Sequence, residues 1–443
     1  MRATIPSTLL AALLVAFTTQ AGELGAVVRK AKVDVYAEPK LEAAKIEALK
    51  QDAPVTIAAQ SGLWYEVKLP NGKSGFIRVN DVRVNYAGTE DGGANLNVLT
   101  SGKAGAGRIT ETAGVRGIDE SDLKSASLNQ TELDAMVANR STAAASTAFA
   151  GQNGWTATTV AFEGEAKARK DKSSSGSASA SEAAGVAQEA SGLMGSLGSK
   201  VNSMLGSAKK VAPKSEGEQA AEELALGPQI AGRVLGARPL WKDAAAQQRV
   251  NVIGRWVASQ TSRPDLPWTF GVIDELEVNA FAAPGGYILV TRGLYELLST
   301  DSEVAAVLGH EISHCVQRDH YNVIRKQELT AMGKDAVSSQ IQAGVTPAET
   351  FARQYVEAHG ATILLTSLDR EAEFRSDKAA EIYLARSGMN PMALYSVLQK
   401  MMALGQQSAS LAQLYKTHPP LDARLNHIDE RGYEKLKAYV TRE

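Results

Sequence analysis

Residues 310–314 read HEISH, an H-E-x-x-H pattern that constrains the fold more than any other feature of this 443-residue chain. The surrounding run SEVAAVLGHEISHCVQ predicts a helix, with Asp301 and Ser302 as N-terminal cap. Residues four apart lie on one helix face, so the imidazoles of His310 and His314 can reach one metal ion. Glu311 lies about 100° round the helix, which suits a general base acting on water. The alternative is a pair of helix histidines that simply hydrogen-bond carboxylates.

A catalytic zinc site needs a third protein ligand, and His320 is one candidate for it. His320 follows His314 by six residues, the spacing of the H-E-x-x-H-x-x-G-x-x-H pattern. The glycine of that pattern, which would break the helix, is Gln317 here. A continuous helix would turn His320 about 240° away from His314.

The second candidate lies in LDREAEFRSDKAAEIYLARSG, residues 368–388, where the pattern predicts another helix. Glu373 can complete the site with its carboxylate. Asp377, four residues later on the same face, can accept a hydrogen bond from a ligand imidazole and fix its tautomer. Glu371 competes with Glu373, but the two point in nearly opposite directions, so only one can face the metal.

The motifs LGHEISH, EFRSD and THPP, in this order, resemble the zinc peptidases of the HtpX-like and BepA-like group, peptidase family M48. The stretch NAFAAPGGYILVTRGL, residues 279–294, is similar to the strand that these enzymes place before the active-site helix. The resemblance covers roughly residues 220–435. It implies a mainly α, zincin-type (α+β) fold with a small sheet and one Zn²⁺ per chain. The ligands would be His310, His314 and Glu373, with Glu311 as catalytic base and Asp377 in support.

Three further residues of this region are candidates for contact with a substrate. His418, in KTHPPLDARL, lies in a loop because Pro419 and Pro420 cannot continue a helix. In the resembled family this element lies near the cleft, so His418 would stabilise the oxyanion or approach the metal in a closed resting state. The alternative is a capping or surface histidine. Asn279 and Ala280 begin the strand, which could pair with an extended peptide through its backbone if it lies at a sheet edge.

The N-terminal part, residues 22–85, has short runs of alternating apolar residues separated by turns such as Pro70-Asn71-Gly72-Lys73. This pattern predicts a small all-β barrel. The stretch GLWYEVKLPNGKSGFI resembles a bacterial SH3-like domain, which implies a ligand such as cell-wall peptidoglycan or a peptide. The alternative is a packing module in which Trp64 and Tyr65 belong to the core.

The rest of the chain predicts a multidomain protein. Residues 1–21 resemble a signal peptide and predict export to the periplasm. Residues 86–112 read as a linker, 113–165 as a small helical segment, 166–215 as a flexible tether rich in Ser, Ala and Gly, and 216–443 as the peptidase domain. No stretch after the signal peptide is apolar enough to predict a transmembrane segment in the mature chain.

Composition limits the possible partners. A net charge of −2 gives no general attraction to nucleic acid, and a single cysteine excludes an intrachain disulfide. The H-E-x-x-H motif, together with the resemblance to the M48 peptidases, implies a zinc endopeptidase that hydrolyses unfolded or damaged envelope proteins. The alternatives are a cell-wall hydrolase and a non-enzymatic binding factor that uses the SH3-like domain.

Overall fold

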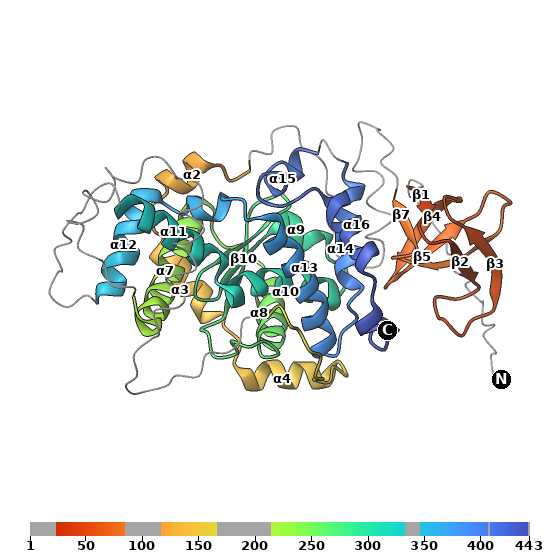
Figure 1. Ribbon diagram of the computed structural model, residues 1–443, viewed down its shortest axis with the longest axis horizontal. Coiled ribbons are helices and arrows are strands. Elements are labelled where there is room, and N and C mark those ends of the chain that lie inside the picture. Colours follow the sequence, from red (N-terminus) through yellow and green to blue (C-terminus); the bar gives the residue numbers. More distant parts are fainter. Residues whose placement is uncertain (1–23, 85–116, 166–213, 333–345, 406–407, 442–443) are drawn as a thin grey trace, which may run out of the picture.

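The computed structural model describes residues 24–84, 117–165, 214–332, 346–405 and 408–441. It confirms a multidomain protein, with an N-terminal all-β unit at one end and a mainly helical unit beside it (Figure 1). We call residues 24–84 the β-domain and the rest the helical unit. The predicted signal peptide, the linker at 86–112 and nearly all of the tether at 166–215 lie outside the described residues.

The β-domain is a seven-stranded antiparallel sheet in the order β3-β2-β6-β5-β4-β1-β7. The strands span Leu24–Val28, Lys32–Tyr36, Lys45–Lys50, Pro54–Ser61, Trp64–Lys68, Ser74–Arg78 and Val82–Val84 for β1 to β7. Alternating residues such as Val55 and Ile57 are buried, as the period of a strand requires. The predicted small all-β unit is therefore confirmed, and its sheet is not closed into a barrel, because β3 and β7 are the ends of the sheet and do not pair with each other. Alternation defines strands, whereas closure depends on pairing between distant residues.

The helical unit contains a three-stranded sheet in the order β8-β10-β9, formed by Thr269–Ile273, Tyr287–Thr291 and Ala280–Ala283 respectively. Strand β10 pairs in parallel with β8 and antiparallel with β9, so β9 is an edge strand. All three strands are buried, which explains their nearly continuous apolar sequence. The small sheet predicted for this region is therefore present, and the turn at Pro284-Gly285-Gly286 separates β9 from β10.

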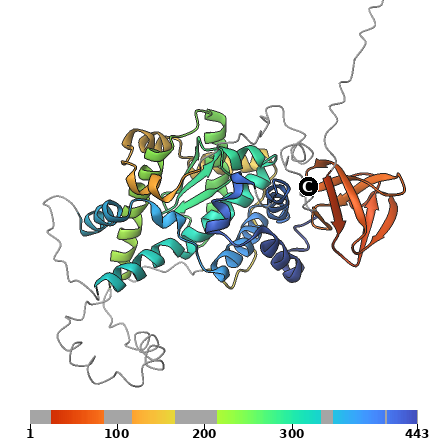
Figure 2. The same ribbon diagram turned by 90° about the horizontal axis from the view of Figure 1, so that it is seen from above.

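Helices surround this sheet. They are α2 (Glu120–Ser125), α3 (Gln130–Ala138), α4 (Ala143–Gln152), α7 (Glu216–Ala237), α8 (Ala244–Ala258), α9 (Arg292–Leu297), α10 (Asp301–Gln317), α11 (Asp319–Met332), α12 (Pro347–His359), α13 (Arg370–Arg386), α14 (Ala393–Ala403), α15 (Leu414–Thr417) and α16 (Leu421–Arg431). Seen from above, α12 lies at the end of the molecule opposite the β-domain (Figure 2). Helices α3 and α4, from the predicted small helical segment, pack on α7 and α8.

The H-E-x-x-H pattern lies on α10, as the apolar periodicity predicts. The N-cap of this helix is Thr300, and not Asp301 or Ser302 as predicted. The Thr300 side chain accepts a hydrogen bond from Glu303 N in a capping box. The helix ends after Gln317, because Arg318 adopts a left-handed backbone with a φ of 60°. A new helix, α11, starts at the next residue. The chain therefore turns between His314 and His320, where the sequence gives no glycine to indicate a break.

Within the part of the chain that the structure describes, we find no helix with the length and apolar character that crossing a membrane requires.

Candidate metal centre

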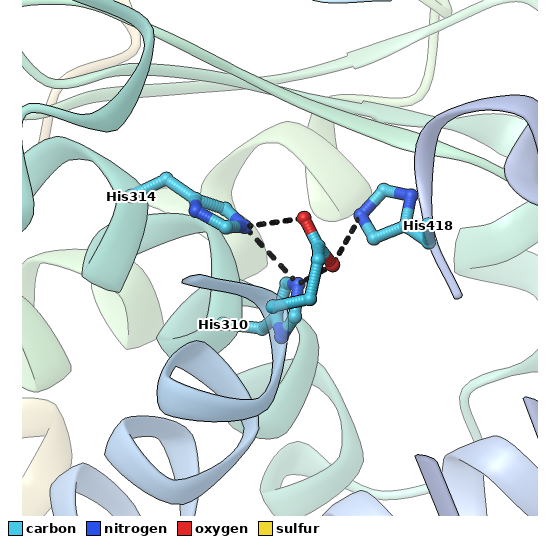
Figure 3. Close-up of side chains that lie close together, drawn as sticks. His310, His314 and His418 are labelled. Atoms are coloured by element: carbon cyan, nitrogen blue, oxygen red, sulfur yellow. Dashed lines mark hydrogen bonds and ion pairs between the residues drawn. The ribbon is translucent and has the colours of Figure 1, made fainter. Parts of the chain in front are cut away.

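Helix α10 turns two imidazoles toward the same point (Figure 3). The Nε2 atoms of His310 and His314 lie 3.2 Å apart, and both side chains are buried. Their spacing of four residues places them one turn apart on one face. Only one proton can lie between two such nitrogens, so a shared cation is a natural partner for their lone pairs.

Helix α13 brings the carboxylate of Glu373 to this pair. Its Oε2 lies 3.6 Å from His310 Nε2 and its Oε1 lies 3.6 Å from His314 Nε2. Glu373 is only 1% exposed, whereas Glu371 is exposed on the same helix. Of the two competing carboxylates, the structure turns Glu373 toward the histidines.

His418 enters from the loop that follows α15. Its Nε2 lies 3.7 Å from Glu373 Oε2, and its ring centroid is 5.5 Å from that of His310. Burial lowers the pKa of His418 to about 3, so its ring is neutral and offers a lone pair. The other ring nitrogen, Nδ1, lies 2.9 Å from Thr417 Oγ1.

The donor atoms of His310, His314, Glu373 and His418 all lie within 4.8 Å of one another. Among the described residues, these are the side chains that gather with ligand spacing. Glu373 Oε2 is buried without a hydrogen-bond partner, which is costly unless another group satisfies it. Imidazole nitrogens with one carboxylate are the donor set that zinc prefers. The chemistry and spacing of these donors therefore fit a divalent cation such as Zn²⁺.

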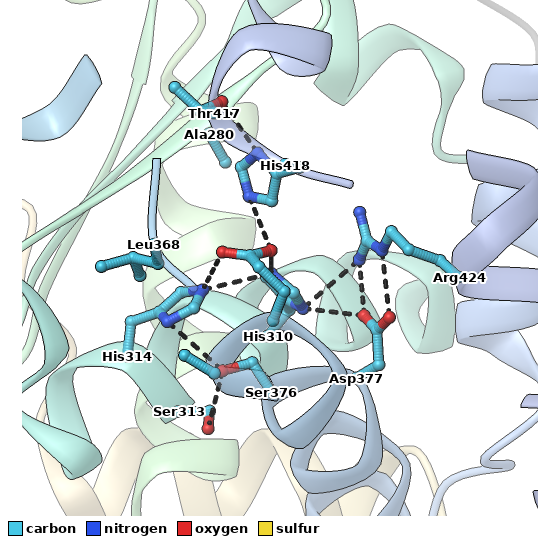
Figure 4. A network of polar contacts seen from close by, with 12 residues as sticks. Ala280, His310, Ser313, His314, Leu368, Ser376, Asp377, Thr417, His418 and Arg424 are labelled. Carbon is cyan, nitrogen blue, oxygen red and sulfur yellow. Dashed lines mark hydrogen bonds and ion pairs between the residues drawn. The ribbon is translucent and has the colours of Figure 1, made fainter. Parts of the chain in front are cut away.

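Asp377 holds the ring of His310 in place (Figure 4). Its Oδ1 lies 3.0 Å from His310 Nδ1, and Arg424 Nε donates to its Oδ2 at 3.0 Å. Burial raises the pKa of Asp377, but Arg424 and His310 outweigh this effect and keep that pKa well below its usual range. Burial and Arg424 lower the pKa of His310, whereas the neighbouring carboxylates of Asp377 and Glu373 raise it, with a net result of about 9 in the metal-free chain.

A second carboxylate, which the sequence analysis missed, supports His314. Asp319 Oδ2 lies 2.9 Å from His314 Nδ1, and Arg375 donates to Asp319 Oδ1 at 2.7 Å. Ser376 Oγ lies 3.3 Å from the same His314 nitrogen. Asp319 reaches this position because the chain breaks at Arg318.

Two other residues from the motif region stay outside the ligand cluster. His320 is buried beside the site, with its ring centroid 6.1 Å from that of His314. Burial lowers the pKa of His320 to about 4. Cys315 is buried and donates to the carbonyl oxygen of Ala283 at 3.3 Å, and burial raises the pKa of its thiol. The structure therefore gives Cys315 a packing role.

Glu311 points into a small pocket next to the cluster. The pocket has a volume of about 30 Å³. It is lined by Ala280, Leu294, Val307, His310, Glu311, Leu394, Val397, Leu398, Met401, Leu414, His418 and Arg424. Burial raises the pKa of Glu311, which makes its carboxylate a stronger base than an exposed one.

The two residues predicted to contact substrate lie at the start of the edge strand. Ala280 begins β9 and lines the pocket of Glu311, and it lies near His418 in Figure 4. Asn279 Oδ1 accepts from Ala280 N, while its buried Nδ2 has no hydrogen-bond partner. The Asn279 side chain thus carries a spare donor next to Ala280, which lines the pocket.

Residues 244–432 match the sequence model of peptidase family M48. Over 215 residues, 48% of its length, the chain is 28% identical to the Beta-barrel assembly-enhancing protease of Escherichia coli (strain K12). Over 167 residues it is 28% identical to Metalloprotease LoiP of the same organism. Over 154 residues it is 30% identical to Mitochondrial metalloendopeptidase OMA1 of Arabidopsis thaliana.

These alignments cover 44% of the first relative, 63% of the second and 29% of the third, so the chain spans less than two thirds of each. The shared region contains α8 to α16 and hence every residue of the ligand cluster. The geometry of the cluster and the family match coincide in the same segment. The chain therefore carries a domain of peptidase family M48, at residues 244–432.

Proposed function

We propose that this protein is a zinc-dependent endopeptidase, with His310, His314 and Glu373 as the zinc ligands. One observation carries the proposal: four donor atoms of the right chemistry, three of them on buried residues, converge within 4.8 Å, and a buried glutamate, Glu311, lies beside them. Zinc, when bound, acts as a Lewis acid that lowers the pKa of a coordinated water molecule and polarises a carbonyl group. A structural zinc site would give Glu311 no task.

Glu311 is the general base in this proposal. Its buried carboxylate takes a proton as water attacks the peptide carbonyl, and then passes that proton to the leaving amine. Because burial raises the pKa of Glu311, its carboxylate accepts a proton more readily than an exposed carboxylate does. Asp377 and Asp319 keep His310 and His314 in the tautomer whose Nε2 lone pair faces the metal.

His418 has two possible tasks in the reaction cycle. In the structure its Nε2 belongs to the ligand cluster, which supports a closed resting state with four protein ligands. Its other task is to stabilise the oxyanion, for which it must move away from Glu373. A catalytic zinc keeps one position open, so His418 leaves the cluster before a substrate binds.

The substrate in this proposal is an extended polypeptide. Strand β9 is the edge of its sheet and starts beside the cluster, so it can pair with a substrate backbone. Asn279, which precedes β9, and Ala280, its first residue, are proposed to contact the substrate. Backbone pairing tolerates most side chains and selects unfolded segments, which fits an exported enzyme that removes damaged envelope proteins in the periplasm.

The test is the cleavage of unfolded casein by the full-length protein. We expect activity in the wild type, its loss after chelation with recovery on adding zinc, and a loss of at least about a hundredfold in Glu311→Gln. Zinc content by mass spectrometry should stay at one ion per chain in Glu311→Gln. The matched control is Glu371→Gln, an exposed glutamate near the site, which should keep full activity.

Two outcomes would contradict the proposal. Wild-type protein that holds zinc but cleaves no polypeptide, while releasing fragments from purified peptidoglycan, would favour a cell-wall hydrolase. Casein cleavage that survives both the chelator and Glu311→Gln would remove the metal centre from the mechanism.

A further inference from the structure

The β-domain packs against α14 and α16, two helices that border the candidate metal centre (Figure 1). A module attached only for ligand binding would need no specific polar contact with these helices. The hydrogen bonds across this boundary are instead specific and buried or partly buried, and they come from β4, from β7 and from the turn before β7.

Gln399 shows this most clearly, because it is fully buried in the middle of α14. Its Nε2 donates to the carbonyl oxygens of Val79 and Val82 at 2.9 and 3.0 Å, and its Oε1 accepts from Val84 N at 2.9 Å. The β-domain backbone thus satisfies both ends of this amide. Without the β-domain, the amide would lose all three partners.

The opposite side of α14 faces the pocket beside the candidate metal centre. Leu394, Leu398 and Met401 line the small pocket into which Glu311 points. Because one helix carries both surfaces, the position of the β-domain sets the position of this pocket wall. Interiors are close-packed and transmit such displacements.

Arg83, on β7, makes the corresponding contact with α16. It donates to Asn426 Oδ1 at 3.1 Å and pairs with Asp429, and its side chain is only 9% exposed. Five residues before Asp429 on the same helix, Arg424 binds Asp377, which in turn holds the ring of His310. Arg83 therefore fixes the helix that supplies the cation behind a proposed zinc ligand.

A third contact reaches the start of α10. Gln60, on β4, donates to Ser396 Oγ at 2.8 Å, and Ser396 donates to Glu303 Oε1 at 2.7 Å. Glu303 belongs to the capping box of the helix that carries His310 and His314. The β-domain is thus hydrogen-bonded directly to α14 and α16, and to α10 through Ser396 of α14.

We propose that the β-domain is a fixed part of the peptidase, and that Arg83 and Gln399 are positioning residues that hold α16 and α14 against the metal centre. The second half of this inference rests on the proposed zinc site. The first half, the fixed docking, does not depend on any metal. The two halves are therefore tested separately.

Calorimetry of the metal-free, full-length protein tests the docking. We expect the β-domain and the helical unit to unfold in one joint transition. Gln399→Met, which keeps the volume but leaves Val79 O, Val82 O and Val84 N unpaired, should lower the midpoint by roughly 2–8 °C. The control is Lys73→Met, at an exposed lysine that hydrogen-bonds Glu47 within the β-domain, and it should leave the unfolding midpoint unchanged. Two separate transitions in the wild type, or an unchanged midpoint in Gln399→Met, would overturn the docking.

Zinc affinity, measured by competition with a chromophoric chelator at a temperature where every variant is folded, tests the positioning. Arg83→Met should weaken zinc binding roughly two- to thirtyfold, and Asp429→Asn should do the same. The double variant should lose no more than either single one, since both remove the same contact. Arg83→Lys should recover part of the affinity, because it keeps the charge but not the fork to Asn426.

A purely structural role for Arg83 would leave zinc affinity in the folded variants within twofold of the wild type, and that result would overturn the positioning. A wild type that binds no zinc at all would instead overturn the proposed function, and the positioning with it. A joint transition sensitive to Gln399→Met would still support the docking in that case.

Discussion

His314 Nδ1 lies 2.9 Å from Asp319 Oδ2, and the other oxygen of that carboxylate is held by Arg375. The pair repeats the arrangement at the neighbouring histidine, where Asp377 and Arg424 hold His310. Each imidazole therefore has a carboxylate behind it, and each carboxylate has an arginine. This double support fixes both rings with their Nε2 atoms toward Glu373.

Replacement of Asp319 should weaken the metal site without removing a ligand. We expect Asp319→Ala to lower zinc affinity about 10–100-fold, since the ring of His314 loses its orienting partner. Asp319→Asn should lose less, because the amide oxygen can still accept from Nδ1. Chelator competition measures both. Glu371→Ala, on the exposed part of α13, is the control. If Asp319→Ala binds zinc as tightly as wild type, the contact of Ser376 Oγ with His314 is sufficient to orient the His314 ring, and Asp319 is not needed for it.

The sequence predicted the ligand helix because helical periodicity alone places His310 and His314 on one face. It left the third ligand open between His320 and a carboxylate of the 368–388 helix. The packing of α13 on α10 turns Glu373 inward to 1% exposure, which favours this carboxylate as the proposed third ligand.

Asp319 was missed for a local reason. The sequence pattern carries the helix past Gln317, whereas Arg318 breaks it with a left-handed backbone that a non-glycine residue rarely adopts. The alternating residues predicted the strands of the β-domain, but not that its sheet stays open, because strand pairing depends on distant residues. The docking of Gln399 has no sequence signal either, since its partners are backbone atoms more than 300 residues away.

Gly309 allows α10 and α13 to approach closely enough for Glu373 to reach the histidines. A Cβ atom at Gly309 would lie 3.3 Å from the Cα of Ala380 and 3.6 Å from Leu384 Cδ1. Gly309→Val should therefore separate the helices, destabilise the fold by about 1–3 kcal/mol and weaken zinc binding. Thermal unfolding of the metal-free protein and chelator competition measure the two effects. Gly151→Val, at a helical glycine with open space around it, is the control for the change in stability. Unchanged zinc affinity in Gly309→Val would mean that the helices tolerate the larger side chain.

His418→Ala should remove one of four donors from the closed site. We expect zinc to pass to excess EDTA several-fold faster than in the wild type, since three ligands hold the ion less firmly than four. In the cobalt-substituted protein, the visible absorption bands should shift as one nitrogen ligand is lost. His359→Ala is the control, because this histidine stacks on Tyr355 away from the cluster. Identical cobalt spectra in wild type and His418→Ala would show that His418 does not bind the metal.

Stability should depend on pH through Glu277, which is buried beside Glu275. Burial first, and then the charge of Glu275, raise the pKa of Glu277 from an ordinary 4.5 to about 7. The folded protein thus binds this proton more tightly than the unfolded chain does. As the pH rises from about 4.5 to about 7, the unfolded chain gives up the proton more readily and the free energy of unfolding falls, and above that range the full loss is present.

Glu277→Gln removes this penalty, because the amide stays neutral at every pH. We expect its unfolding midpoint to exceed that of the wild type by roughly 2–4 °C near pH 8 and to match it near pH 4.5. Thermal unfolding of the metal-free protein at both pH values measures the difference, and the other titrating groups cancel because both proteins share them. Glu430→Gln, at an exposed glutamate on α16, should show no such pH dependence. A Glu277→Gln variant that is less stable than wild type at pH 8 would mean that the ionised carboxylate contributes a favourable contact, and that its burial does not oppose folding.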